Sequence, residues 1–185
     1  MNKMRWIILA MVAIIGLGGC VLAGTIRLDS PMVIGSTASD AIPIYVEPYR
    51  VHDSFAPLGT PVEWDRDVYI KQAIAVRMKA RFVDSPATAR IAITTTTFEI
   101  GHVGAVHCSS ATKINGLTVK TYIKRPSQFF HGVRDGYLDL ARGDAEIVSA
   151  ALDKILLGDV VHEATGVLEI GDKETYRGLI EIKIK

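Results

Sequence analysis

Two groups of residues in the middle of this chain have side chains whose types and spacing could do chemistry. Ser110 and Lys113 have the S-x-x-K spacing, in which a lysine activates a serine nucleophile when both share one side of a helix start. His102, His107 and Cys108 lie close together in the sequence and carry imidazole and thiol groups, which zinc prefers as ligands. The two groups therefore raise two possibilities, a serine hydrolase and a metal site.

The secondary structure predicted around these residues argues against both sites. Asn115-Gly116 is the strongest short signal for a β-hairpin, because both residues accept the positive φ of a type I′ turn. Side chains along a strand alternate between its faces, so His107 and Cys108 cannot bind one ion together without distortion. For the same reason Ser110 and Lys113 point to opposite faces. The predicted register pairs Ile114 with Leu117, Thr112 with Val119, Ser110 with Thr121 and Cys108 with Ile123 on the drier face.

We therefore expect the S-x-x-K spacing to be coincidental, His107 to be a surface histidine and Cys108 to be a buried structural thiol. No G-x-S-x-G sequence, and no glycine-rich phosphate loop after a predicted strand, offers another catalytic frame. Water and the helix dipole account for a group of carboxylates near the predicted start of the second helix: Asp135, Asp139, Asp144 and Glu146. The sequence thus predicts no catalytic residue, no metal and no cofactor. A hydrolase that uses His107 or Ser110 is the least favoured alternative.

Hydrophobic periodicity predicts the elements around the hairpin. Alternation over 41–51 indicates a strand, which Pro43 and Pro48 place at a sheet edge or a bulge. A loop is expected over 52–64, where Phe55, Leu58 and Trp64 either anchor it to the core, the favoured alternative, or form an exposed apolar lip. The other expected elements are a helix over 65–83 capped by Asp65, a strand over 90–100 that either has a bulge or is apolar on both sides, a loop over 126–142 with a short strand at 137–140, a helix over 145–157 capped by Gly143-Asp144, and a terminal hairpin from 167–170 and 178–185. This order predicts an α+β fold, a mainly antiparallel sheet with two helices packed on one face.

The first twenty residues follow a different pattern. Lys3 and Arg5 precede an apolar run over 6–17, and small residues follow directly before Cys20. This pattern is typical of a secretory signal peptide, and the run is shorter than the roughly 20 apolar residues of a membrane span. The alternative is a first helix that stays in a core or spans a bilayer, but no basic stop signal follows Cys20.

Leu17-Gly18-Gly19-Cys20 resembles the lipobox of bacterial lipoproteins. The resemblance implies cleavage between Gly19 and Cys20 and attachment of lipid to the sulfur and the new amino group of Cys20. By resemblance to enterobacterial lipoproteins, the absence of aspartate at Val21 favours the outer membrane. The expected parts are a signal peptide over 1–19, a lipidated cysteine and flexible tether over 20–40 with candidate short edge strands at 25–28 and 32–34, and a single periplasmic domain over 41–185.

Charge and cysteine content limit the possible partners. Without residues 1–19 the chain loses two of its 21 basic side chains and no acidic one, so 19 basic groups face 20 acidic groups. This near-neutral balance argues against nucleic acid, which needs a clustered basic face, and it offers no electrostatic hold on an anionic bilayer. Membrane attachment would then depend on the lipid at Cys20. Cys108 would be the only thiol left, which leaves no internal disulfide.

The predicted order of elements over 41–161 is similar in outline to that of small envelope lipoproteins, namely the auxiliary lipoproteins of ABC-type lipid transporters and the lipopolysaccharide-assembly lipoprotein. The resemblance implies a non-catalytic subunit that binds a partner protein or a lipid. We therefore expect a lipid-anchored interaction or assembly protein at the periplasmic face of the outer membrane, with an envelope protein as its partner. The alternative is a lipid-binding protein with an apolar cavity lined by residues such as Phe98, Phe129 and Phe130.

Overall fold

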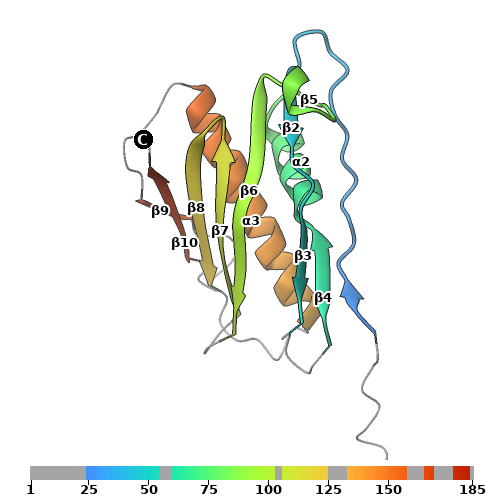
Figure 1. Ribbon diagram of the computed structural model, residues 1–185, viewed down its shortest axis with the longest axis vertical. Coiled ribbons are helices and arrows are strands. Elements are labelled where there is room, and N and C mark those ends of the chain that lie inside the picture. Colours follow the sequence, from blue (N-terminus) through green and yellow to red (C-terminus); the bar gives the residue numbers. More distant parts are fainter. Residues whose placement is uncertain are drawn as a thin grey trace, which may run out of the picture.

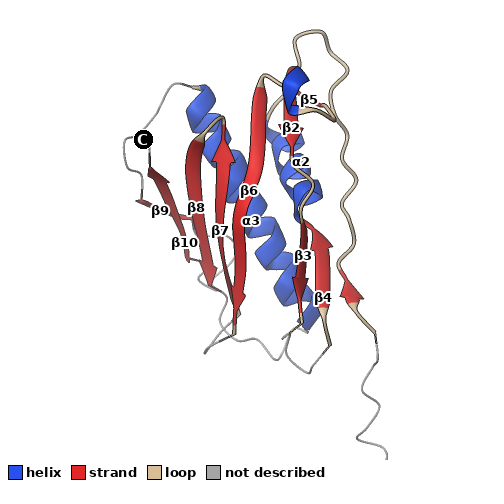
Figure 2. Cartoon of the chain, viewed as in Figure 1, coloured by secondary structure: helices blue, strands red, loops and turns tan. Residues whose placement is uncertain are grey.

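The computed structural model has an α+β fold in which two helices pack on one face of a large mixed sheet (Figure 1). The structure describes residues 24–54, 60–102, 106–124, 133–157, 165–168 and 177–183. Figure 2 shows both helices on the same side of the long central strands. The α+β class and the helices on one face were predicted correctly. The predicted signal peptide and Cys20 lie outside the described residues.

Within the described residues the large sheet has seven strands. Their order is β5 (Ala80–Phe82), β2 (Ile42–Val46), β6 (Ile91–Gly101), β7 (His107–Ile114), β8 (Leu117–Lys124), β10 (Arg177–Lys183) and β9 (Thr165–Leu168). β2 runs parallel to both β5 and β6, and all the other pairs are antiparallel. The sheet is therefore antiparallel over most of its width, with a parallel part at one side.

The hairpin of β7 and β8 has the predicted register at all four predicted pairs. Asn115 and Gly116 have φ values of 47° and 86°, as a type I′ turn requires. Of the two alternatives predicted for the preceding strand, the bulge is present, between Thr95 and Thr97. The terminal hairpin is also present as β9 and β10, and β10 continues the sheet beyond β8.

The predicted edge position of the first strand is wrong. Residues 41–51 form two strands, and the first of them, β2, lies between β5 and β6. β2 tolerates Pro43 because the ladder to β6 begins one residue later, at the pair of Ile44 and Ile91. The missing N–H of the proline would point past the start of β6, while its carbonyl still accepts a hydrogen bond from the Arg90 N–H at 2.8 Å.

A second, smaller sheet lies beside the lower part of the large one (Figure 1). Its strand order is β1 (Ile26–Arg27), β4 (Val62–Asp65) and β3 (Arg50–Asp53). The edge strand expected at 25–28 is therefore present, and Leu28 beside it is buried in the core. Residues 32–34 form no strand, and the segment 52–64 contains parts of β3 and β4 that were predicted as loop.

The first helix, α2 (Arg66–Arg77), is shorter than the predicted 65–83. The end of the predicted helix is strand β5 instead, because Ala80 and Phe82 pair with β2 at the edge of the sheet. Asp65 precedes the helix without a side-chain capping bond, since its carboxylate binds Arg50 and Arg27. Tertiary pairing thus outweighs the helical periodicity at the C-terminal end of this segment.

The second helix, α3 (Val133–Leu156), begins well before the predicted start. The predicted loop and the short strand at 137–140 are wrong over the described residues from 133 onward. Gly136 and Gly143 suggested a break, but Gly143 is buried within the helix. Tyr137, Leu140, Ala141 and Asp144 form the spacing of a buried helix face, so packing of that face outweighs the helix-weakening glycines. Within the described residues neither helix has both the length and the apolarity needed to cross a membrane.

Candidate functional site

The residues that the sequence offered for chemistry lie on different faces of the sheet. Ser110 is buried and faces the helices, whereas Lys113 is exposed. The predicted strand likewise placed the two side chains on opposite faces. Cys108 is fully buried beside Ile123 and Leu140. Burial raises the pKa of the Cys108 thiol well above its usual range, with a further contribution from the charge of Asp144.

The histidines do not join Cys108 in one site. His107 is half-buried, and its ring centroid lies 5.6 Å from that of Tyr122. No group of three or more potential metal ligands occurs in the part of the chain that the structure describes. Gly19 and Cys20, the predicted cleavage and lipidation site, lie outside that part.

A buried ion pair that the sequence did not predict joins the two helices. Arg66 is the first residue of α2 and Asp144 lies in the middle of α3, and each side chain is only 1% exposed. Arg66 Nε donates to Asp144 Oδ2 at 2.7 Å, and Nη2 donates to Oδ1 at 3.2 Å. The carboxylate was predicted to be a solvated group at a helix cap, and this is wrong because α3 begins much earlier and turns Asp144 toward the sheet.

Hydroxyl groups of the sheet surround this ion pair. Thr95, Ser110 and Thr112 accept hydrogen bonds from the guanidinium at 2.6, 2.9 and 2.8 Å. Ser110 and Thr121 each donate to Asp144 Oδ1 at 2.8 Å. We call these residues the Arg66–Asp144 cluster: Arg66, Asp144, Thr95, Ser110, Thr112 and Thr121. Because its members use their hydrogen-bonding groups on one another, the cluster tightly joins α2 and α3 to β6, β7 and β8.

The sequence held one signal for this cluster. The predicted hairpin register placed Ser110 opposite Thr121, and Thr112 nearby, on the face expected to be dry. Buried hydroxyl groups need hydrogen-bond partners, so a row of them predicts a polar group on the element that covers the sheet. Nothing in the sequence identified Arg66 and Asp144 as those groups.

A groove opens where the two sheets diverge. β6 pairs with β2 only over Ile91–Ile93 and then continues to Gly101, paired on its other side with β7. On the side that β2 has left, β3 runs nearby, and among the described strands it pairs only with β4. The groove has a volume of about 380 Å³ and is lined by Tyr49, Arg50, Val51, His52, Asp53 and Ser54 on one bank and by Phe98 and Ile100 on the other. We call it the β3–β6 groove.

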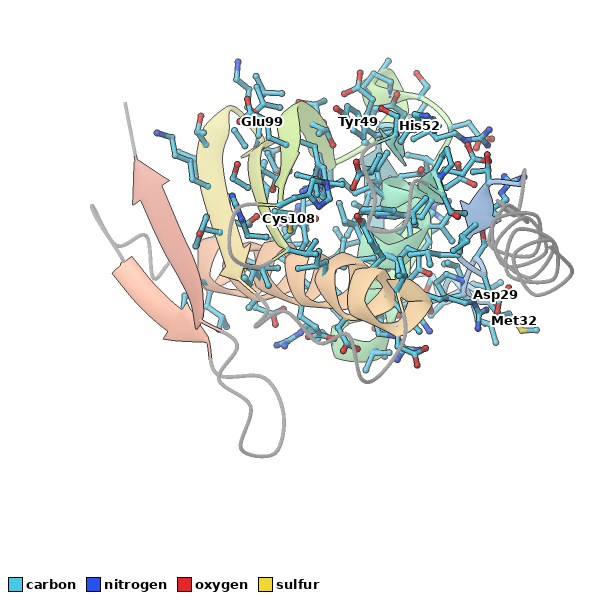
Figure 3. All side chains as sticks on the ribbon, turned by 90° about the horizontal axis from the view of Figure 1, so that it is seen from below. Asp29, Met32, Tyr49, His52, Glu99 and Cys108 are labelled. Atoms are coloured by element: carbon cyan, nitrogen blue, oxygen red, sulfur yellow. The ribbon has the colours of Figure 1, made fainter. Side chains whose placement is uncertain are left out.

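Two of the residues that line the groove lie on the side of the molecule away from α3. Figure 3 shows Tyr49 and His52 on that side. Beneath the groove Phe98 packs edge-on against Trp64, with their ring centroids 5.8 Å apart. The Arg66 guanidinium lies 5.3 Å from the centroid of the Phe98 ring. The floor of the groove thus rests directly on the Arg66–Asp144 cluster.

Asp53 lies at one end of the groove and is nearly buried. Tyr137 of α3 donates a hydrogen bond to Asp53 Oδ2 at 2.5 Å, and burial together with this bond raises the pKa of the Tyr137 hydroxyl. His102 Nε2 lies 2.9 Å from the same oxygen without the alignment of a hydrogen bond. The contacts therefore connect the ends of β3 and β6 to α3.

The contact between Asp53 and His102 resembles the pair of a catalytic triad in which a carboxylate orients a histidine. A triad also needs a nucleophile that is hydrogen-bonded to the histidine. Among the described residues, no hydroxyl or thiol forms a hydrogen bond with either ring nitrogen of His102. The serine of the S-x-x-K spacing, Ser110, is part of the Arg66–Asp144 cluster instead. The geometry of the described residues therefore favours a structural role for Asp53 and His102.

The ligand-binding alternative predicted a cavity lined by Phe98, Phe129 and Phe130. Phe98 packs against Trp64 and lies near Arg66, and it lines the β3–β6 groove. The other two phenylalanines lie outside the described residues. No protein-family model matches this chain, and no curated protein or solved structure matches it.

Proposed function

We propose that this protein is a lipid-anchored, non-catalytic interaction or assembly module of the bacterial cell envelope. In this proposal Cys20 carries the lipid, holds the domain at the periplasmic face of the outer membrane, and leaves the folded part to bind an envelope protein. The resemblance of Leu17-Gly18-Gly19-Cys20 to a lipobox supports the anchor.

The observation that carries the binding role is the β3–β6 groove, which lies between the two sheets and has a volume of about 380 Å³. Edge strands with open backbone groups are common docking sites for other chains. The buried polar groups of Ser110 and Asp144 are in contrast already paired within the Arg66–Asp144 cluster, which supports a structural use of those residues.

The anchor is tested by intact-mass analysis of the exported full chain from a Gram-negative host. The expected product lacks residues 1–19, carries lipid at Cys20 and stays in the membrane fraction. Cys20→Ser is expected to remain unacylated. Cys108→Ser is the matched control, because Cys108 is buried in the domain core and its loss leaves the anchor in place. A wild-type product with an unacylated Cys20 still joined to its leader would overturn the anchor.

The binding role is tested separately, by crosslinking in the native envelope followed by native electrophoresis. The expected result is a defined complex larger than the monomer, which is lost when Cys20→Ser removes the protein from the membrane. A protein that remains monomeric in its native membrane would contradict the interaction role. A hydrolytic activity of the purified protein that is lost with Ser110→Ala, while the fold is kept, would favour the hydrolase instead.

A further inference from the structure

Exposed apolar side chains gather on the side of the domain along which the N-terminal segment, residues 26–36, runs (Figure 1). Met32, Ile34 and Val76 are 81%, 74% and 80% exposed. Ile34 and Val76 line one hollow of about 400 Å³, between the N-terminal segment and the end of α2. Figure 3 shows Met32 at the outer margin of the molecule. We call these three residues the N-terminal apolar patch.

The N-terminal segment is held against the domain on both sides of the patch. Leu28 is buried in the core, and the Tyr69 hydroxyl donates a hydrogen bond to the carbonyl of Asp29 at 2.7 Å. Farther along, the Ser36 N–H donates to the carbonyl of Ala80 at 2.7 Å. The patch is therefore a fixed part of the surface of the domain.

Exposure alternates along the stretch between these contacts. Met32 and Ile34 are exposed, whereas Pro31, Val33 and Gly35 are half-buried. An extended chain sends alternate side chains to opposite sides, so Met32 and Ile34 share the outer side. Apolar side chains that are exposed singly are ordinary, but apolar side chains that are exposed side by side mark an interaction surface.

The length of chain between Cys20 and the domain indicates what covers the patch. β1 begins at Ile26, so only residues 21–25 separate Cys20 from this strand. The six residues from Cys20 to Ile26 span at most about 20–22 Å, and the eight from Ile26 to Ile34 span at most about 29 Å. A lipid at Cys20 would therefore keep this side of the domain beside the bilayer. At such a high local concentration of lipid a weak apolar contact is sufficient.

We infer that the N-terminal apolar patch inserts into the surface of the bilayer, so that the domain lies with this side on the lipid. This inference rests on the proposed lipid anchor at Cys20 and adds the orientation of the domain to it. Of the surfaces that could cover the patch, the bilayer is the one that the chain itself would bring within reach.

The charges around the patch indicate that the contact is apolar. Lys79 pairs with Asp40 at 3.0 Å, and Arg77 pairs with two carboxylates of α3 at 2.8 and 3.3 Å. These basic groups are therefore already matched by acidic ones and give the patch no preference for an anionic bilayer. Apolar side chains at the level of the lipid headgroups bind a neutral bilayer equally well.

The test places the full lipidated chain in phosphatidylcholine vesicles, after its mass has shown lipid at Cys20. Ile34→Trp puts a fluorescent side chain in the patch at an exposed position, where the larger ring leaves the core untouched. We expect its emission to shift to shorter wavelength, and to lose intensity when brominated phosphatidylcholine replaces the ordinary lipid. The same loss is expected in vesicles of phosphatidylcholine and phosphatidylglycerol in equal parts. Trp64 is 1% exposed and contributes a constant background.

Two further variants locate the contact. Leu157→Trp is the matched control, because Leu157 is 76% exposed and directly follows α3, whose end lies beside β8, across the sheet from the N-terminal segment (Figure 1). We expect its emission to remain that of a solvent-exposed tryptophan, without quenching. Adding Met32→Ser and Val76→Ser to Ile34→Trp is expected to reduce the quenching, while the lipid keeps the protein on the vesicle. Circular dichroism checks that every variant folds.

Three outcomes would overturn the inference: no quenching of Ile34→Trp, equal quenching of Leu157→Trp, or quenching only in vesicles that contain phosphatidylglycerol. A wavelength shift without quenching would assign the patch to protein, and to a second copy if the shift rises with the density of protein on the vesicle. An unacylated Cys20 would remove the anchor and this inference together. On acylated protein the quenching decides the inference alone, and the complex in the native envelope tests the interaction role separately.

Discussion

The Arg66–Asp144 cluster gives the most demanding prediction about stability. Asp144→Asn keeps the size of the side chain and removes its charge, which leaves the Arg66 guanidinium buried and without a counter-ion. Breaking a buried ion pair in this way costs about 3–5 kcal/mol. A domain of this size has a total unfolding free energy of about 5–15 kcal/mol. We therefore expect Asp144→Asn to remove a large share of the stability or to prevent folding.

The control for this prediction is an ion pair between the same two helices that is exposed to water. Arg77 of α2 binds Glu146 and Asp153 of α3 at 2.8 and 3.3 Å, and its side chain is 35% exposed. Exposed pairs contribute about 0–1 kcal/mol each, so Glu146→Gln, which removes one of the two, is expected to cost less than about 1 kcal/mol. The contrast between the two variants isolates the effect of burial, because both remove one charge from a contact between α2 and α3.

Urea unfolding followed by far-ultraviolet circular dichroism measures both variants. A double variant, Arg66→Met with Asp144→Leu, is expected to lose less stability than the sum of its single variants, because no isolated charge remains in the core. It does not recover fully, since the hydroxyls of Ser110 and Thr121 lose their partner. An Asp144→Asn variant within about 1 kcal/mol of wild type would refute the reasoning.

Three further predictions concern single residues. The Cys108 thiol is expected to react with Ellman's reagent at pH 8 only as fast as the protein unfolds, because burial excludes the reagent and raises the pKa of the thiol. Rapid labelling of the folded protein would contradict this prediction. Asn115→Ala should destabilise the hairpin by about 1–2 kcal/mol, because alanine disfavours a φ of 47° and cannot accept the hydrogen bond from the Ala92 N–H. Asn115→Gly should cost less in the same urea assay, because glycine accepts this φ. Hydrogen bonding to Arg50 lowers the pKa of Asp65 from 3.8, so the charged carboxylate stabilises the folded protein above pH 3.8, and this stability is lost as the pH falls further. Asp65→Asn should therefore make the free energy of unfolding less dependent on pH in the acid range. An unchanged pH dependence would show that the contact is not maintained in solution.

The parts of the fold that the sequence predicted are those that nearby residues determine. The hairpin register follows from Asn115-Gly116, whose backbone preference fixes both strands together. The burial of Trp64 was predicted from its apolar ring, and its side chain is 1% exposed, although it lies on β4 and not in a loop. The other two predicted anchors, Phe55 and Leu58, lie outside the described residues. In each case a local preference and the final packing favour the same structure.

The parts that were wrong depend on contacts with distant residues. Ala80–Phe82 continues a helical pattern in the sequence but pairs with β2. The early start of α3 escaped prediction because Gly136 and Gly143 weaken a helix intrinsically, and only packing against the sheet shows that the face is buried. Arg66 and Asp144 are 78 residues apart, and each alone resembles a solvated charge. A single sequence carries no sign that such residues meet.

The position of the Arg66–Asp144 cluster also bears on the proposed binding site. Phe98 lines the β3–β6 groove and lies over the Arg66 guanidinium, which bonds Asp144 of α3 and Thr95 of the same strand as Phe98. A cluster that joins both helices to β6 holds this strand in place where β2 no longer supports it. A partner bound at the groove would therefore meet an edge that is already ordered, and binding would not also carry the cost of ordering that edge. In this proposal the buried ion pair, a weak source of stability in general, serves mainly to order the strand edge beneath the groove.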